Sequence, residues 1–398
     1  MKKINSKALD YHAFPQPGKL SVSSSKTCDT AEDLSLAYTP GVAEPVLEIV
    51  KDPKNAYRFT NKGNLVAVIT NGTAVLGLGN TGALASKPVM EGKGVLFKRF
   101  ADIDVYDIEI DCEDPDEFIQ TVVNISPTFG GINLEDIAAP ECFYIESELK
   151  KRLSIPVFHD DQHGTAVIVA AGLINALEIQ QKLIEKVKIV FLGAGAAGCS
   201  CARLLKLMGA TDITMVDSKG ILTNDRKDLN QYNHDLAIDT KGKTFNDAIQ
   251  HADVFIGVSG ANLLKNEHVK SMSKNPIIFA LANPDPEMLP SEAHAIRDDI
   301  VMATGRSDFD NQVNNVLGFP FLFKGALEAK AKQINTDMLI AAANALALLA
   351  KEPVPQSVLE AYDVAELNFG PNYIIPKPFD PRLIDWAAKA VKEAYIDK

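Results

Sequence analysis

The chain has 398 residues, of which 46% are hydrophobic and 23% charged, and its formal net charge is −12. One hydrophobic core rarely serves so long a chain, so two domains are expected. The negative charge and the lack of a long basic stripe argue against nucleic-acid binding. No apolar run reaches the roughly 20 residues of a membrane-spanning helix. Neither a nucleic acid nor a membrane is therefore an expected partner.

The N-terminus and the cysteines indicate the cellular compartment. Two lysines follow Met1 with no apolar stretch behind them, so a secretory signal is not expected. The five cysteines are scattered in apolar surroundings, which favours reduced thiols over a disulfide framework. No Cys/His cluster has zinc-finger spacing. These features predict a cytoplasmic protein whose ligand is a small molecule.

The first part of the chain, to about residue 160, predicts short strands at 65–70 and 103–110 among Gly-rich turns and helices. The apolar segment 165–181 predicts a largely buried helix. Strands and helices then alternate, which predicts a parallel sheet covered on both faces. The expected strands are 188–192, 212–217, 252–258, 276–282 and 299–305, with one helix ending near Leu207.

The last part of the chain is predicted to be mostly helical. Helices are expected at 324–333, at 336–351 with Thr336 as N-cap, and at 381–395, and such a segment usually packs back on the first domain. The predicted fold class is α/β, with a Rossmann-type doubly wound parallel sheet domain and a discontinuous α/β outer domain with C-terminal helices. The dinucleotide domain is expected at 162–314, inserted within an outer domain of residues 1–161 and 315–398.

A glycine fingerprint for dinucleotide binding occurs once in the required context. Gly193-Ala-Gly195-Ala-Ala-Gly198 follows a predicted strand and opens a predicted helix, so the backbone can approach a pyrophosphate at the helix N-terminus. Asp217 ends the next strand, where a carboxylate accepts hydrogen bonds from a ribose diol. The expected cofactor-binding residues here are Gly193, Gly195, Ala196, Ala197, Gly198 and Asp217.

A second glycine pattern, Gly77-Leu-Gly79-Asn-Thr-Gly82, lacks that context. Pro88 stands where a phosphate-binding helix would continue, and proline removes a hydrogen bond inside a helix. We therefore expect this loop to shape a pocket in the outer domain and not to bind a second dinucleotide.

Two pairs of adjacent carboxylates carry the strongest sign of chemistry. Asp160 and Asp161 end an apolar run, and burying like charges side by side is costly unless they bind a cation or transfer a proton. Capping of the following helix is the alternative. Glu135 and Asp136 form the second pair, and together the pairs could supply three oxygen ligands to Mg2+ or Mn2+. Surface charge is the alternative for this second pair.

Two further residues are candidates for proton transfer. Lys93 lies between glycines before an apolar run, and a lysine held near a cation and partly desolvated has a lowered pKa and becomes a usable base. A solvated loop lysine is the alternative. Tyr38 precedes a proline turn and is a candidate proton donor, or else a core aromatic that caps the turn.

Seven sequence blocks resemble the malic enzyme family in their order and spacing, over essentially the whole chain. The chain is most similar to the short bacterial-type form, and it ends at Lys398 without the acyltransferase-like extension of some bacterial relatives. The blocks are LAYTPGVAEP (36–45), VLGLGNTGALASKPVMEGKGVLFK (75–98), INLEDIAAPECF (132–143), FHDDQHGTA (158–166), GAGAAG (193–198), ALANPDPE (280–287) and NNVLGFP (314–320).

The resemblance implies a role for each matched residue. Lys93 would be the base that takes the malate hydroxyl proton, Tyr38 the acid that protonates the enol, and Asp160 a partner of the lysine. The implied metal ligands are Glu135, Asp136 and Asp161, and the implied substrate-binding amides are Asn283, which also faces the cofactor, and Asn315. The larger eukaryotic relatives carry an arginine at the position of Ala74, so the substrate carboxylate must be recognised by other groups here.

The resemblance implies oxidative decarboxylation of (S)-malate to pyruvate and CO2 by a homodimer that uses NAD or NADP and Mg2+ or Mn2+. Three alternatives are an amino-acid dehydrogenase of similar plan, a metal-dependent oxaloacetate decarboxylase and a non-catalytic dinucleotide sensor. The cofactor preference stays open, because Asp217 favours NAD by repelling a 2′-phosphate, whereas Ser218 and Lys219 could accommodate that phosphate.

Overall fold

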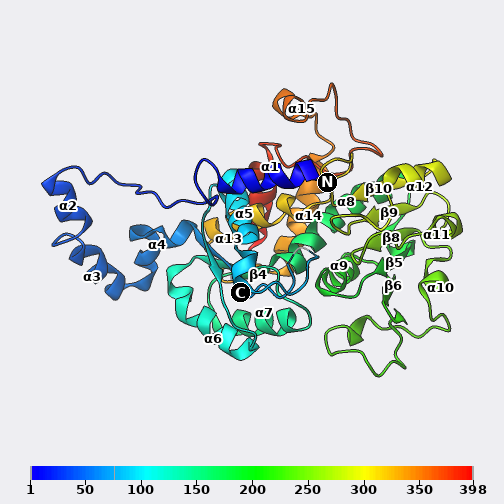
Figure 1. The fold of residues 1–398 in the computed structure, drawn as a ribbon, viewed down its shortest axis with the longest axis horizontal. Helices are drawn as coiled ribbons and strands as arrows, with labels where there is room; N and C mark the ends of the chain where they lie inside the picture. Colours follow the sequence, from blue (N-terminus) through cyan, green and yellow to red (C-terminus); the bar gives the residue numbers. More distant parts are fainter. Residues whose placement is uncertain (1, 76, 397–398) are drawn as a thin grey trace.

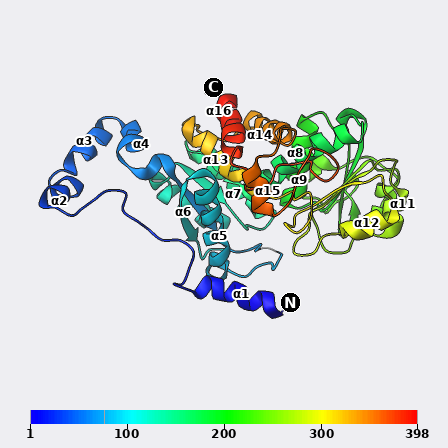
Figure 2. The same cartoon turned by 90° about the horizontal axis from the view of Figure 1, so that it is seen from above.

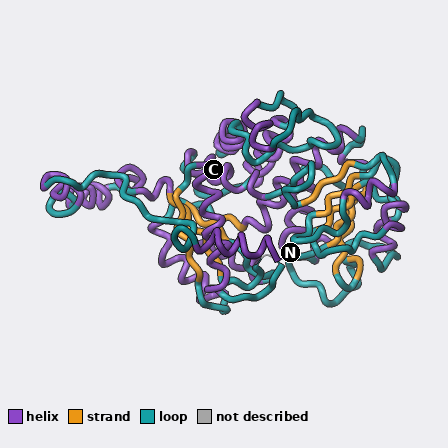
Figure 3. Tube along the Cα trace, turned by 45° about the horizontal axis from the view of Figure 1, so that its top comes forward, coloured by secondary structure: helices purple, strands orange, loops and turns teal. Residues whose placement is uncertain are grey.

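The computed structural model describes residues 2–75 and 77–396, and side chains from residue 6 onward. It contains two separate parallel sheets with helices between and around them (Figure 1, Figure 3). The predicted α/β class with a Rossmann-type sheet is confirmed. Among the described helices, none has the length and apolarity needed to cross a bilayer.

The first sheet has four parallel strands in the order β2-β1-β3-β4. Leu134 of β3 pairs with His159 of β4, so the residues that follow these two strands leave the sheet side by side at its carboxyl edge. The strands are β1 (Leu65–Thr70), β2 (Asp104–Glu109), β3 (Gly131–Leu134) and β4 (Val157–His159).

The second sheet has six strands in the order β10-β9-β8-β5-β6-β7, and all but β7 are parallel. Its central strands are apolar and buried throughout, as expected for a parallel sheet covered by helices on both faces. The strands are β5 (Lys188–Leu192), β6 (Asp212–Asp217), β7 (Gly220–Ile221), β8 (Val254–Gly257), β9 (Ile277–Ala280) and β10 (Val301–Thr304).

Helices cover both sheets and include two π-helical turns. The α-helices are α1 (Lys2–Ala13), α2 (Ala31–Ala37), α3 (Ala43–Lys51), α4 (Ala56–Phe59), α5 (Ala83–Ala101), α6 (Pro115–Ile125), α7 (Glu141–Arg152), α8 (Thr165–Ile179), α9 (Ala196–Leu207), α10 (Phe245–Ile249), α11 (Asn266–Ser271), α12 (Pro290–Ile296), α13 (Phe319–Glu328), α14 (Thr336–Leu349), α15 (Gln356–Tyr362) and α16 (Lys389–Ala394). The 3-10 turns are η1 (Pro53–Asn55), η2 (Asn61–Asn64), η3 (Ser126–Thr128), η5 (Ile184–Lys186), η6 (His234–Leu236) and η7 (Asn315–Leu317), and the π turns are η4 (Asp160–Gly164) and η8 (Ile384–Ala388).

The chain returns to the first sheet after the second one. The ring of Phe97 on α5 meets Phe319 and Phe323 of α13 edge-on, with centroids 4.8 and 5.3 Å apart. α8 is apolar on almost every side and most of its residues are buried, as its sequence predicts. These contacts bring residues from near positions 95, 160 and 320 into one region.

Four local predictions are wrong in detail. α5 continues through Pro88, although a proline inside a helix removes one hydrogen bond, because residues on both sides of it, among them Ser86 and Met90, are buried against the rest of the protein. α13 begins at Phe319 instead of residue 324, since Pro320 fits the first helical turn. The N-cap of α14 is Asn335, whose side chain accepts from the N–H of Met338, and not Thr336. The C-terminal helix also divides into η8 and α16.

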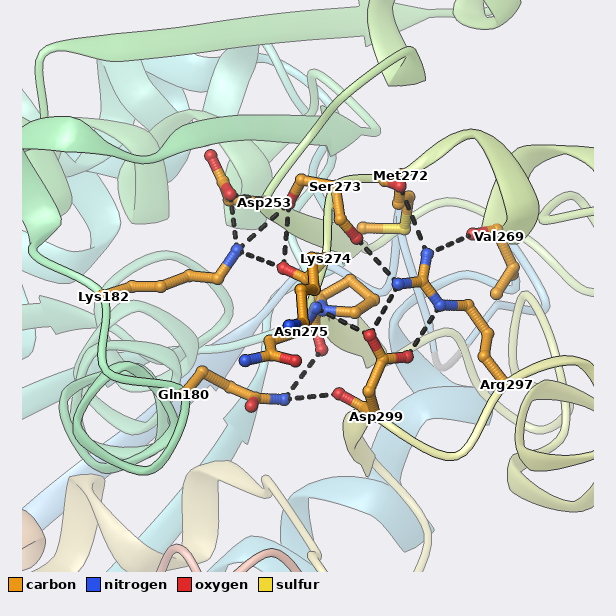
Figure 4. Close-up of polar contacts among 11 residues, drawn as sticks. Gln180, Lys182, Asp253, Val269, Met272, Ser273, Lys274, Asn275, Arg297 and Asp299 are labelled. Atoms are coloured by element: carbon orange, nitrogen blue, oxygen red, sulfur yellow. Dashed lines mark hydrogen bonds and ion pairs between the residues drawn. The ribbon is translucent and has the colours of Figure 1, made fainter.

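A polar network closes the amino ends of β8, β9 and β10 (Figure 4). Lys182 Nζ lies 2.5 Å from Asp253 Oδ1, and Arg297 binds Asp299 through two hydrogen bonds of 2.7 and 2.8 Å. Arg297 also donates to the carbonyls of Val269, Met272 and Ser273. Because parallel α/β sheets bind ligands at the opposite, carboxyl edge, this network serves the fold.

Candidate active site

Lys93 is buried on α5 between two carboxylates. Its Nζ lies 2.6 Å from Asp160 Oδ2 and 2.8 Å from Glu135 Oε1. The ring of Phe319 lies beneath the ammonium, 4.3 Å away. Only 7% of Lys93 is exposed, so it is not a solvated loop lysine.

The expected lowering of the Lys93 pKa is not what this arrangement produces. Burial by itself lowers the pKa of Lys93, but the negative charges of Asp160 and Glu135 outweigh burial and raise it. A cation was expected beside the lysine, whereas two carboxylates are its immediate neighbours. Proton uptake by Lys93 therefore depends on how the charge of those carboxylates is shared.

Three carboxylates gather at the carboxyl edge of the first sheet. Glu135 and Asp136 follow β3, Asp161 follows β4, and one oxygen from each lies within 4.8 Å of the other two. The side chain of Asn133 donates to Glu135 Oε2 at 2.9 Å, and the backbone N–H of Asp136 donates to Asp161 Oδ2 at 3.0 Å. The structure thus brings together carboxylates from the two acidic pairs, which lie far apart in the sequence.

This carboxylate cluster fits a hard divalent cation. Burial raises the pKa of Glu135, and the negative charge of Asp161 adds to the rise; partial burial also raises the pKa of Asp161. Mg2+ and Mn2+ prefer oxygen ligands, and a cation would offset this repulsion. Glu135, Asp136 and Asp161 are therefore the residues that could hold one.

Asp160 and Asp161 lie in the π-helical turn η4 and point in different directions. Asp160 is fully buried, and its Oδ2 accepts from Lys93 and from the side-chain amide of Asn315. Asp161 faces the carboxylate cluster that it forms with Glu135 and Asp136. In the described structure, neither aspartate side chain accepts a hydrogen bond from the backbone N–H groups in the first turn of α8. A Cβ at Gly164 would lie 1.9 Å from Asp160 Oδ1, so the turn requires glycine there. Helix capping thus does not explain the pair.

Glu146 of α7 is a buried partner of this turn that the sequence analysis missed. Its Oε1 accepts from the backbone N–H of His159 at 3.2 Å, and His163 Nε2 lies 2.8 Å from the same oxygen. Burial opposes ionisation of Glu146, but His163 and Lys150 outweigh it and lower its pKa. Burial lowers the pKa of His159 to about 4, so that ring is neutral at pH 7. The sequence signal that could have revealed it was the position of Glu146, a single carboxylate on the apolar face of helix α7.

The glycine fingerprint forms the turn between β5 and α9. Gly193 has φ +122, and a Cβ there would lie 2.8 Å from the Val258 carbonyl oxygen. A Cβ at Gly198 would lie 2.0 Å from the Gly193 carbonyl oxygen, whereas none of the described atoms lies within 4 Å of one at Gly195. Ala196 and Ala197 open α9, so the helix N-terminus is available to a pyrophosphate.

Asp217 does end β6 as predicted, but its carboxylate is already paired. Arg226 donates to both of its oxygens, at 2.9 and 2.7 Å. Arg226 also binds Asp228, which in turn lies 2.7 Å from Lys219 Nζ. Besides Lys219, which the sequence indicated, the folded loop thus places Arg226 at this position.

Asn283 lies in the loop after β9, at the carboxyl edge of the second sheet, and its side chain donates to the Leu281 carbonyl at 3.3 Å. A Cβ at Gly77 would lie 3.2 Å from the Asn283 carbonyl oxygen. The second glycine loop therefore lies against the loop that follows β9 of the dinucleotide sheet. Its expected role in shaping a pocket of the outer domain stays a prediction.

Tyr38 is not brought to this cluster within one chain. It follows α2 in an arm that extends away from both sheets (Figure 1, Figure 2). Its exposed fraction is 69%, so it is not a core aromatic either.

The comparisons with known proteins agree over the whole chain. Two family models match, the malic enzyme N-terminal domain at residues 17–150 and the malic enzyme NAD binding domain at residues 162–363. An NADP-dependent malic enzyme of Halomonas elongata is 59% identical over 98% of this chain and 93% of its own length. An NAD-dependent malic enzyme of Rhizobium meliloti is 51% identical over 98% of this chain, which spans only 51% of that protein.

Several other curated relatives are also about twice as long as the matched region, since the chain spans about half of their length. A solved structure of malic enzyme from Pyrococcus horikoshii superposes with a TM-score of 0.89 at 44% identity, covering 98% of this chain and 90% of that one. The chain therefore belongs to the malic enzyme family.

Proposed function

We propose that the protein oxidatively decarboxylates (S)-malate to pyruvate and CO2, with reduction of NAD(P) and dependence on a divalent cation. The observation that carries this proposal is the position of Lys93. Its amine lies between Asp160 and Glu135, and Glu135 also belongs to the carboxylate cluster that fits a cation. A titratable amine thus adjoins the proposed cation site at the carboxyl edge of the first sheet, and a cation bound there would offset the negative charge of Glu135, one of the two charges that raise the pKa of Lys93.

Each residue has one task in this scheme. Lys93 Nζ takes the proton of the malate C2 hydroxyl, and Asp160 holds the resulting ammonium. The amides of Asn283 and Asn315 orient the substrate, and Tyr38 delivers the proton to C3 after CO2 leaves. When bound, the dinucleotide accepts the hydride from C2, and the cation, held by Glu135, Asp136 and Asp161, acts as a Lewis acid toward the C2 oxygen.

An assay with malate, Mn2+ and NAD or NADP tests the proposal directly. Absorbance at 340 nm should rise with malate, and pyruvate should form in equal amount. Turnover that survives EDTA would instead favour an amino-acid dehydrogenase. Loss of CO2 from oxaloacetate without any malate-dependent signal would favour a decarboxylase. Dinucleotide binding without turnover would favour a sensor.

The pairing of Asp217 favours NADP over NAD. A free carboxylate would repel a 2′-phosphate, but Arg226 occupies both oxygens of Asp217, and Lys219 adds a second cation beside it. A 2′-phosphate of the cofactor could bind these cations, because the ion pair between Lys219 and Asp228 is partly exposed to solvent and can be exchanged for one with the phosphate. We therefore assign Arg226 and Lys219 to the 2′-phosphate.

Arg226→Ala should reverse this preference. Loss of a charged hydrogen-bonding group costs about 1.5–3 kcal/mol, so kcat/KM for NADP should fall about 10-fold or more. The released Asp217 should keep or improve kcat/KM for NAD. Initial rates with each cofactor measure both values, with Lys270→Ala on α11 as a control that removes an exposed positive charge. Equal losses for both cofactors would contradict the assignment.

A homodimer explains the arm. The arm consists of α2, α3 and α4, and no residue of these helices is buried. Several of their apolar side chains are more than half exposed, namely Leu34, Val46, Leu47 and Val50. Such short helices are marginal alone in water, and an exposed apolar surface of this kind marks an interface. A second copy of this chain is the simplest cover, since closed symmetric dimers are the commonest assemblies. We propose that the arm carries Tyr38 into the partner's site.

Mixing two inactive variants tests this arrangement. Tyr38→Phe and Lys93→Ala each remove one member of every site. If the two residues come from different chains, a heterodimer of these variants has one intact site, and a statistical mixture should recover about a quarter of wild-type activity. Mixing after subunit exchange, measured at 340 nm, should show this gain. No gain from confirmed heterodimers would mean that both residues act within one chain.

The proposed division into domains follows the sheets. Residues 1–161 and 315–398 form the outer domain, supported by the contact of α13 with α5, and residues 162–314 form the dinucleotide domain. We also propose a cytoplasmic location, where NAD(P) and malate are available and where the cysteines, all unpaired in the described part of the chain, stay reduced.

A further inference from the structure

Glu146 is a buried carboxylate that the proposed reaction does not use. It lies on the face of α7 that otherwise buries apolar residues, among them Cys142, Ile145 and Leu149. Burying a charge is costly unless specific partners repay it. The groups that contact the Glu146 carboxylate therefore show which part of the structure it holds in place.

The carboxylate of Glu146 contacts both ends of the η4 turn. On the N-terminal side the backbone N–H of His159 donates to Oε1 at 3.2 Å. On the C-terminal side His163 Nε2 lies 2.8 and 3.0 Å from the two oxygens. The His163 ring also packs against Phe158, with centroids 5.5 Å apart. One side chain thus fastens the residues on either side of Asp160 and Asp161.

Asp161 is the proposed metal ligand whose direction depends most on this turn. Its side chain is 36% exposed, whereas that of Glu135 is 5% exposed. The backbone N–H of Asp136 donates to Asp161 Oδ2 at 3.0 Å, so the contact of Asp161 with this cluster depends on where the turn holds its backbone. The adjacent Asp160 is held in place by its hydrogen bonds with Lys93 and Asn315. A shift of the turn would therefore move Asp161 first.

We propose that Glu146 is a positioning residue which, through His163 and the His159 backbone, aims Asp161 at Glu135 and Asp136 before the cation arrives. The inference rests on the proposed function, because it takes these three carboxylates as the cation site. Groups that orient metal ligands commonly change metal affinity by about 10–100-fold when they are removed.

Binding of Mn2+ to the protein without malate or dinucleotide provides the test. Glu146→Gln keeps the shape of the side chain but loses its negative charge and has only one acceptor oxygen for three donors, the His159 N–H, His163 Nε2 and Lys150 Nζ, so the Kd for Mn2+ should rise about 10-fold. His163→Ala should raise it similarly, and the double variant should bind no worse than the weaker single one, since the two residues act as one unit. Glu148→Gln, on the same helix but facing Lys151, is the matched control and should bind as wild type.

Two further readouts separate positioning from damage to the fold. The Kd for the dinucleotide should be unchanged in each variant, and a saturating Mn2+ concentration should restore most of kcat in Glu146→Gln. If Glu146→Gln does not fold, His163→Ala carries the test, because that side chain is 22% exposed.

Asp161→Asn distinguishes the possible failures. If it weakens Mn2+ binding while Glu146→Gln and His163→Ala bind as wild type, the positioning role is overturned and the cation site stands. Independent, additive losses in the double variant also overturn it. If Asp161→Asn itself leaves Mn2+ binding unchanged, the cation site is wrong and the inference falls with it.

Discussion

Lys93→Ala is expected to lower kcat for malate oxidation by about 100-fold to 10,000-fold, the usual contribution of a general base. The amine is the basic group that the described structure places beside both Asp160 and the carboxylate cluster. The Kd for the dinucleotide should stay within about two-fold of wild type, because the glycine fingerprint lies on the other sheet. Steady-state rates at 340 nm and cofactor fluorescence measure the two quantities.

Lys93→Arg refines this prediction. Arginine keeps the positive charge that Asp160 and Glu135 require, but it does not lose its proton at any pH that the protein meets. Activity should therefore remain low although the charge of the site is restored. Lys98→Ala, an exposed position on the same helix, should be fully active. High activity in Lys93→Arg would mean that Lys93 only balances charge and that another group accepts the proton.

Asp161→Asn is expected to weaken Mn2+ binding by at least about 100-fold, more than the loss of a residue that only orients a ligand. The amide keeps the shape of the side chain but removes one of three negative charges from the cluster. Removal of the cation with EDTA should abolish turnover in the wild type, and added Mn2+ should restore it. In Asp161→Asn the same addition should restore little.

Calorimetric titration with Mn2+ and the Mn2+ dependence of kcat measure these effects. Asp160→Asn is an informative companion, because Asp160 faces Lys93 and not the cluster. It should lower kcat while leaving the Kd for Mn2+ much closer to wild type. If both substitutions weakened Mn2+ binding equally, the division of roles between the two adjacent aspartates would be wrong.

Much of the fold could be predicted from local sequence. The strands of the second sheet are continuous apolar runs, and the fingerprint at 193–198 follows one of them, so strand, turn and helix are each specified by neighbouring residues. Helix ends were less predictable. Pro88 inside α5 and Asn335 before α14 show that a single residue does not decide where a helix begins or continues.

Function at the level of the family also came from sequence, through seven blocks in a recognisable order. What local patterns could not supply was the surroundings of each side chain. Glu146 looks like one acidic residue in an ordinary helix, and its importance comes only from the packing of α7 against the η4 turn. Arg226 is nine residues from Asp217, and only the folded loop pairs them.

The sequence by itself determined the fold class, the dinucleotide turn and the candidate residues, because periodicity, glycine conformation and residue chemistry act over short stretches of chain. The tertiary structure decided which of these residues meet. It placed Lys93 between Glu135 and Asp160 and brought Glu135, Asp136 and Asp161 into one cluster. It also replaced an expected cation beside Lys93 with two carboxylates, and left Tyr38 in an exposed arm. Long-range packing and electrostatics set these relations, and no short segment of the chain contains them.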